Sequence, residues 1–191
     1  MIVQPPTTYD LADLFEHQDP VLFEDLLPSL LFWLRLRSGT RAPVVRRATF
    51  LVEIEREARR LDLVWDAARL ADLAPALPRQ LQALDEGRTV ARERATENAG
   101  YVLALIALSA FEPRRRVLHF NTFAAPDLIF DDTPGAERGV EVAARTRGGQ
   151  RVLVRIRDDK MPGLLARPGY AEIQLSLWSG RPRAALIERV R

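Results

Sequence analysis

Two acidic residues, Asp127 and Glu141, stand in a pattern that suits divalent-cation chemistry. Asp127 follows Pro126 at the start of a predicted strand, and Glu141 lies fourteen residues later in the next predicted strand. Carboxylates on adjacent strands offer the oxygen ligands that Mg²⁺ prefers, and a bound Mg²⁺ can activate water for hydrolysis. The pair is therefore a candidate magnesium site.

The pattern resembles the PD-(D/E)XK nuclease motif, in which an Asp and a Glu on adjacent strands hold Mg²⁺. In that motif a lysine two residues after the Glu assists the attack, but this chain has Ala143 there. Arg145 is too basic to accept a proton, and nothing in the sequence places Lys160 near the pair. The sequence also predicts a second strand directly after that of Glu141, where the nuclease fold has a helix. A degenerate metal-dependent nuclease is therefore only the third hypothesis.

Arginine side chains suggest a different chemistry, the binding of anions. Every strong base except Lys160 is an arginine, and the planar guanidinium matches phosphate and carboxylate groups. High-GC coding is the alternative source of this composition, because it favours Arg over Lys. The candidate residues for nucleic-acid or anion binding are Arg114, Arg115, Arg116, Arg145, Arg151, Arg155, Arg157, Trp178 and Arg183.

A predicted hairpin around Gly148 and Gly149 brings Arg145 opposite Arg151. A three-residue loop at 147–149 gives one apolar face, which pairs Val140 with Ile156, Val142 with Val154 and Ala144 with Val152. The other face pairs Arg145 with Arg151 and Glu141 with Arg155. Two facing arginines require an anion between them: a carboxylate of this chain, a carboxylate of a second subunit, or a phosphate.

A second predicted hairpin turns at 179–182 and places Trp178 opposite Arg183. It also pairs Leu175 with Leu186. Trp178 and Arg183 would form a stacking platform for a base or an ordinary cation–π contact on the surface. The other basic cluster, Arg114–Arg116, follows a predicted long helix. There it would contact phosphate or stabilise the helix C-terminus.

The elements that position these residues predict an α+β fold, with an N-terminal helical bundle packed on a C-terminal, mainly antiparallel sheet of meander-like hairpins. Residues 1–112 read as helices. The first begins at Asp19-Pro20 and is broken or kinked at Pro28, with the second piece ending near Gly39. The others are one over 45–61, two short ones over 63–73 and 78–84, and a long one from Thr89 to Phe111. Residues 113–191 read as strands, over 117–123, 127–132, 139–146, 151–157, 171–178 and 183–190. The two regions share one compact unit or form two small domains.

Charge divides the chain at the same point. Residues 1–112 carry 13 Arg against 17 Asp and Glu, and residues 113–191 carry 14 Arg and one Lys against 9 Asp and Glu. The absence of cysteine excludes disulfides and thiolate metal sites, and two distant histidines argue against zinc. No leader or membrane-spanning segment is apparent, so we expect a cytoplasmic protein without a membrane partner.

The leading hypothesis is a non-enzymatic protein, without a cofactor, that contacts nucleic acid with an arginine-lined sheet face. The alternative is a protein-interaction or assembly subunit whose basic sheet pairs with acidic helices, in the same chain or in a second copy. The nuclease hypothesis alone implies a metal, with Asp127 and Glu141 as ligands to Mg²⁺.

Overall fold

A computed structural model describes residues 5–34, 45–87, 92–121 and 124–191. Its described strands form one mixed sheet in the order β1-β3-β2-β8-β7-β6-β5-β4. The strands are β1 (Thr7–Asp10), β2 (Val45–Ile54), β3 (Glu57–Asp66), β4 (His119–Phe120), β5 (Leu128–Asp131), β6 (Glu137–Arg145), β7 (Tyr170–Gly180) and β8 (Arg183–Arg189).

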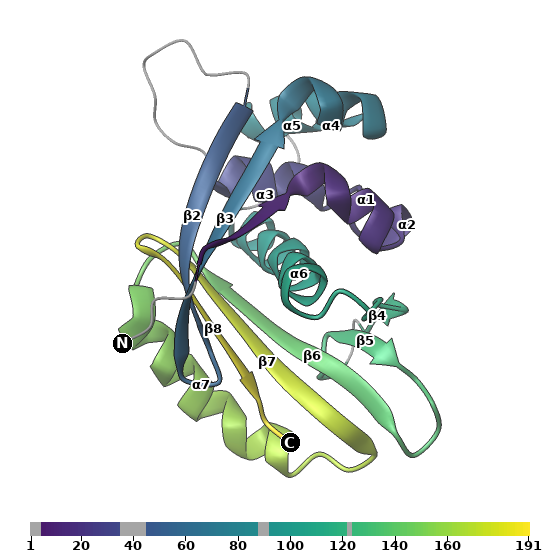
Figure 1. Cartoon of the computed structure of the whole chain (residues 1–191), viewed down its shortest axis with the longest axis vertical. Coiled ribbons are helices and arrows are strands. Elements are labelled where there is room, and N and C mark those ends of the chain that lie inside the picture. The colour runs from purple at the N-terminus through teal and green to yellow at the C-terminus, as the bar shows by residue number, and fades with distance from the viewer. Residues whose placement is uncertain (1–4, 35–44, 88–91, 122–123) are drawn as a thin grey trace.

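Helices cover both faces of this sheet, so the fold has three layers (Figure 1). One face carries a 3₁₀ turn (Leu11–Asp13) and the helices α1 (Leu14–His17), α2 (Pro20–Phe23), α3 (Leu27–Leu34), α4 (Ala67–Leu73), α5 (Leu77–Asp85) and α6 (Arg92–Phe111). The other face carries α7 (Gly149–Leu165). No helix in the described part of the chain is both long and apolar enough to cross a bilayer.

The α+β class is confirmed, but the predicted arrangement of a helical bundle on an antiparallel meander is wrong. Three strand pairs are parallel: β1 with β3, β2 with β8, and β6 with β7. The predicted boundary at residue 112 does not separate helices from strands, because β1, β2 and β3 belong to the same sheet as the C-terminal strands.

The helix predicted over residues 45–61 is wrong, because this segment forms the β2–β3 hairpin. Leu61, Leu63 and Trp65 of β3 are buried and belong to the main hydrophobic core, at the two-residue spacing of side chains on one face of a strand. The turn residues Glu55 and Arg56 have φ of 49° and 70°, so two non-glycine residues adopt the left-handed conformation. Asn or Gly usually signals such a turn, and neither is present here.

The strand predicted over residues 151–157 is also wrong, because these residues belong to α7. Leu153, Ile156 and Leu164 are buried at helical spacing and pack on the sheet. The hairpin predicted around Gly148 and Gly149 therefore does not form. Instead α7 connects β6 to β7, which pair in parallel.

The β7–β8 hairpin is present, but its predicted register is wrong by two residues. Leu177 lies opposite Leu186, and the turn contains only Arg181 and Pro182. A shift of two residues keeps each side chain on the same face, so the apolar pattern could not distinguish the two registers.

The long helix α6 crosses the sheet closely and is buried over its C-terminal half, as predicted. At Gly100 an added Cβ atom would lie 2.9 Å from Cβ of Ala144 on β6, so glycine allows the close approach. The predicted cap Thr89 and the predicted helix end near Gly39 lie outside the described residues.

Candidate functional site

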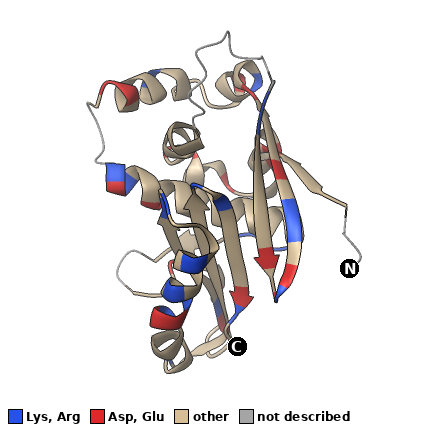
Figure 2. Cartoon of the chain, turned by 90° about the vertical axis from the view of Figure 1, so that its left-hand side faces the viewer, with Lys and Arg blue, Asp and Glu red and all other residues tan. Residues whose placement is uncertain are grey.

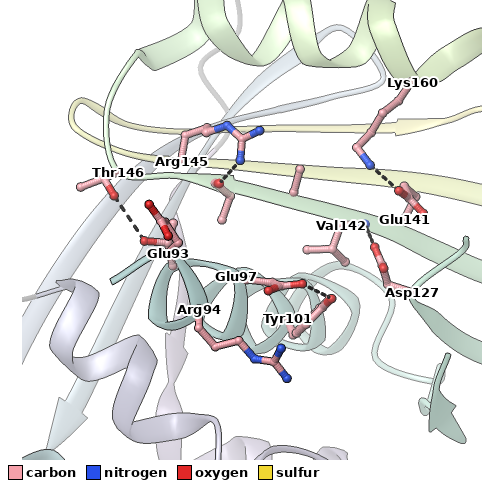
Figure 3. A pocket seen from close by; sticks show the side chains of 13 residues that line it. Glu93, Arg94, Glu97, Tyr101, Asp127, Glu141, Val142, Arg145, Thr146 and Lys160 are labelled. Carbon is pink, nitrogen blue, oxygen red and sulfur yellow. Dashed lines mark hydrogen bonds and ion pairs between the residues drawn. The ribbon is translucent and has the colours of Figure 1, made fainter. Parts of the chain in front are cut away.

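A cavity of about 660 Å³ lies between the N-terminal half of α6, the C-terminal half of β6, and α7. Figure 3 shows that Asp127, Glu141 and Lys160 meet at one end of it, and that Arg145 and Thr146 lie at the other. The two acidic residues singled out in the sequence are thus brought together. Asp127 immediately precedes β5 and Glu141 lies on β6, and these two strands are antiparallel neighbours.

The backbone of β6 positions Asp127. The Val142 amide donates a 2.7 Å hydrogen bond to Oδ2 of Asp127. Close packing of the preceding residue helps to hold this geometry: a Cβ atom at Gly139 would overlap the Pro126 ring and lie 2.6 Å from the Leu128 carbonyl oxygen. Glycine at position 139 therefore allows the Pro126-Asp127 segment to lie against β6.

Glu141 is buried, with 6% of its surface exposed, and it lines the cavity. Its predicted partner was Arg155, but its partner in the structure is Lys160, whose Nζ contacts Oε1. The other oxygen, Oε2, is buried and has no hydrogen-bond partner. A buried carboxylate oxygen without a partner is costly unless a ligand satisfies it.

Lys160 reaches the site from α7, the helix that follows β6, whereas the lysine of the motif would stand on β6 at position 143. The sequence could not place it, because Lys160 follows the strand predicted over 151–157 and no helix was predicted there. In the structure its side chain is 34% exposed, so the ammonium group is accessible to a molecule in the cavity.

Burial and the nearby carboxylate of Glu141 raise the pKa of Asp127 to about 6. The two carboxylates repel each other, and a cation between them would relieve that repulsion. Asp127 Oδ2 is occupied by the Val142 amide, and Glu141 Oε1 by Lys160.

Helix α6 adds two residues that the sequence analysis did not single out, Glu97 and Tyr101. The Tyr101 hydroxyl donates a 3.0 Å hydrogen bond to Glu97. Burial and the charges of Asp127 and Glu97 raise the pKa of Tyr101, so its phenol stays protonated. The spacing of Glu93, Glu97 and Tyr101 places them along one side of a helix, and this was the available signal.

The arginines predicted to line a sheet face lie on different elements. Arg145 is on β6, opposite Ser179 of β7 rather than Arg151. Arg151, Arg155 and Arg157 are on α7, and Arg157 forms ion pairs with Asp158 and Glu188. Figure 2 shows basic and acidic residues interspersed along α7. The predicted facing pair of arginines is therefore absent.

The predicted stacking platform at Trp178 is also absent. Trp178 is fully buried, lies opposite Ala185 on β8 and packs edge-on against Phe50 at a centroid distance of 5.4 Å. Arg183 donates to the Leu34 carbonyl oxygen.

The cluster Arg114–Arg116 follows α6, as predicted. Arg115 pairs with Glu112 and Glu172, and Arg116 donates to the Glu16 carbonyl oxygen. Arg114 is exposed. Whether these residues contact nucleic acid stays a prediction.

Within the described ranges, no three His, Cys, Asp or Glu side chains group closely enough to hold a metal by themselves. Comparison with protein-family models, with curated proteins and with solved structures finds no match for this chain. The candidate function therefore depends on the geometry of the cavity alone.

Proposed function

We propose that this chain is a metal-dependent nuclease that hydrolyses phosphodiester bonds at the cavity lined by Asp127, Glu141 and Lys160. The observation that carries the proposal is the convergence of these three side chains, from the residue before β5, from β6 and from α7, on one end of the cavity. The sequence raised two objections to the nuclease hypothesis: a strand was predicted after Glu141 where a helix is expected, and no lysine stood near the acidic pair. The helix α7 between β6 and β7 removes the first, and the position of Lys160 removes the second.

The residues present fit a magnesium ion. Mg²⁺ is commonly held by one or two carboxylates, with water and substrate phosphate completing its shell, so a pair of carboxylates is sufficient. Glu141 has a buried oxygen without a partner, and Asp127 has a pKa raised toward 6 by burial and by Glu141. Asp127 and Glu141 would hold the ion, which supplies an activated water and neutralises phosphate charge.

Each of the chain's own groups then has a defined task. Asp127 and Glu141 accept the cation, and the Val142 amide fixes the orientation of Asp127. Lys160 places an ammonium group beside the phosphate, where it stabilises the negative charge that develops as the bond to the leaving oxygen breaks. Tyr101, with its protonated phenol, donates a hydrogen bond to Glu97 and orients that carboxylate at the cavity wall.

The proposal is tested with the isosteric variants Asp127→Asn and Glu141→Gln. Labelled single-stranded DNA, duplex DNA and RNA are incubated with each protein in Mg²⁺, in Mn²⁺ and in chelator. Both variants are expected to lose cleavage by at least about 100-fold, because each removes a cation-binding oxygen. Asp132→Asn is the matched control, since Asp132 is an exposed acid near β5 that does not line the cavity. Cleavage that survives Glu141→Gln would refute the proposal.

Binding of nucleic acid without cleavage is the second candidate. It is favoured by Ala143, which lacks the basic group of the motif position, and by Arg145, which is exposed at the cavity. It predicts oligonucleotide binding with no cleavage of any substrate in either cation. The assay above separates the two functions.

A further inference from the structure

The C-terminal half of β6 has a free edge along the cavity. Strand β5 pairs with β6 only at Arg138, Gly139 and Val140, so no described strand lies beside the edge from Glu141 to Arg145. The Val142 amide on this edge donates to Asp127, and the Ala144 carbonyl oxygen accepts from Arg145. Helices α6 and α7 flank the edge (Figure 3).

Arg145 lies at the far end of this edge from the carboxylates. Glu141 and Arg145 are four residues apart on one strand, so their side chains leave the same face, about 13 Å apart at 3.3 Å per residue. A polymer with regularly spaced charges could therefore contact both ends of the cavity at once.

The guanidinium of Arg145 has capacity for an anion. It is exposed, and it donates a 3.1 Å hydrogen bond to the Ala144 carbonyl oxygen. Among the described residues no ion pair joins it to a carboxylate, although Glu93 lines the same end of the cavity. By contrast, Arg115 already contacts Glu112 and Glu172.

We propose that the substrate is a single strand of nucleic acid that lies along the free edge of β6, with one phosphate at Asp127 and Glu141 and another on Arg145. This inference rests on the proposed function. A cavity of about 660 Å³ has the size of a pocket for a small ligand, so it holds a short piece of one strand better than a duplex. Tyr101 offers an aromatic ring beside that path, as proteins that bind single strands commonly do.

The charges of the cavity make binding dependent on a cation. Four carboxylates line it (Glu93, Glu97, Asp127 and Glu141), against three basic side chains (Arg94, Arg145 and Lys160). A phosphate is repelled by this balance until a divalent cation occupies the carboxylate end. A merely basic surface would bind the strand without one.

The test measures fluorescence anisotropy of a labelled 12-nucleotide single strand and of its duplex, in Ca²⁺ and in chelator, with a gel to show that the strands stay intact. The wild-type protein is expected to bind the single strand more tightly than the duplex, and only with the cation. Arg145→Ala should weaken single-strand binding about tenfold, because one charged phosphate contact is lost. It should also reduce the slope of log K against log salt by about 0.7.

Arg147→Ala is the matched control, because Arg147 is exposed two residues further on and does not line the cavity. It should leave the affinity within about twofold of wild type, and both variants should melt like wild type. Tighter binding of the duplex, equal binding in chelator, or an unaltered affinity in Arg145→Ala would each overturn the proposed strand path. The nuclease proposal fails separately, through cleavage by Glu141→Gln.

Discussion

At the scale of single residues, the sequence identified the two carboxylates but not the base that joins them. Asp127 and Glu141 were recognisable because a strand-borne Asp and Glu at this spacing suit a divalent cation. Lys160 was not, because its position depends on the orientation of a helix that the apolar pattern did not reveal. Glu97 and Tyr101 could not be predicted either. They reach the cavity because α6 crosses β6 closely at Gly100, and tertiary packing decides that crossing.

Replacing Lys160 with Met is expected to separate cation binding from cleavage. Lys160 occupies one oxygen of Glu141, so its removal should raise the affinity for the cation up to about fivefold, the value of a partly exposed ion pair. Cleavage should fall at least about 100-fold, because the ammonium group is lost from the phosphate. Calorimetric titration with Mn²⁺ and a cleavage assay measure the two effects.

Arg155→Met is the control for this experiment, because Arg155 is an exposed base on the same helix, outside the cavity. It should change neither quantity. If Lys160→Met left both cation affinity and cleavage at the wild-type level, Lys160 would have no part in the site.

At the scale of elements, the C-terminal strands were largely predictable and the two main errors have one cause. Short apolar runs fit both a strand and a helix. In residues 151–157, Val152, Val154 and Ile156 have the two-residue spacing of a strand, while Leu153 and Ile156 have the three-residue spacing of a helix. This segment forms the helix α7, because Leu153 and Ile156 pack on β7 and β8. Residues 45–66 form the β2–β3 hairpin instead of a helix. Its turn residues, Glu55 and Arg56, include no Asn or Gly that would indicate a hairpin in the sequence.

Gly139→Ala should disrupt the site by displacing Pro126 and Asp127. The added methyl group would overlap the Pro126 ring and meet the Leu128 carbonyl oxygen, so the start of β5 must move away from β6. We expect a loss of about 1–3 kcal/mol in the free energy of unfolding and a marked loss of cleavage. Thermal unfolding and a nuclease assay check both effects.

Gly163→Ala is the matched control for that substitution. Gly163 lies in α7, and nothing stands within 4 Å of the Cβ position. Alanine there should be neutral or stabilise the protein by up to about 1 kcal/mol, because it favours a helix. An equally active and stable Gly139→Ala protein would show that the packing of Pro126 does not hold Asp127.

The β2–β3 hairpin depends on Asp62, whose side chain is fully buried. Burial raises the pKa of Asp62, but hydrogen bonds from Arg47, Thr49 and Arg60 outweigh it and lower the pKa from 3.8 to about 2. A lowered pKa means that the stabilisation is fully present above pH 4 and is lost as the pH falls toward 2. Asp62→Asn should therefore cost about 2–3 kcal/mol at pH 7.

The measurement is urea unfolding of wild type and Asp62→Asn at pH 7 and at pH 3. The gap in the free energy of unfolding should narrow at the lower pH, because Asp62 of the unfolded wild-type chain, with a pKa of 3.8, is largely protonated at pH 3 while the folded carboxylate is still mostly ionised. Asp72→Asn, an exposed acid on α4, should show no gap at either pH. A gap that stays constant with pH would mean that the charge of Asp62 does not stabilise the hairpin.

At the scale of the whole molecule, some charges of the acidic and basic regions are neutralised by ion pairs within the fold. Arg115, from the basic region, pairs with Glu112 of the acidic region and with Glu172 on β7. Gln150 at the start of α7 donates to Glu53 on β2, which also joins the two regions. These contacts join the two regions, but they do not test the predicted pairing of a basic sheet with acidic helices.

A cation held by Asp127 and Glu141 would bind only the folded chain, so it should stabilise the molecule as a whole. At about ten times its dissociation constant, a ligand that binds only the folded state adds about 1.4 kcal/mol, which raises Tm by about 3–5 °C for a chain of this length. Thermal unfolding in Mg²⁺, against Na⁺ at equal ionic strength, measures the shift. Glu141→Gln should lose it and Asp132→Asn should keep it. An equal rise in Glu141→Gln would place the cation elsewhere, because that variant lacks the unpartnered buried carboxylate oxygen that the ion requires.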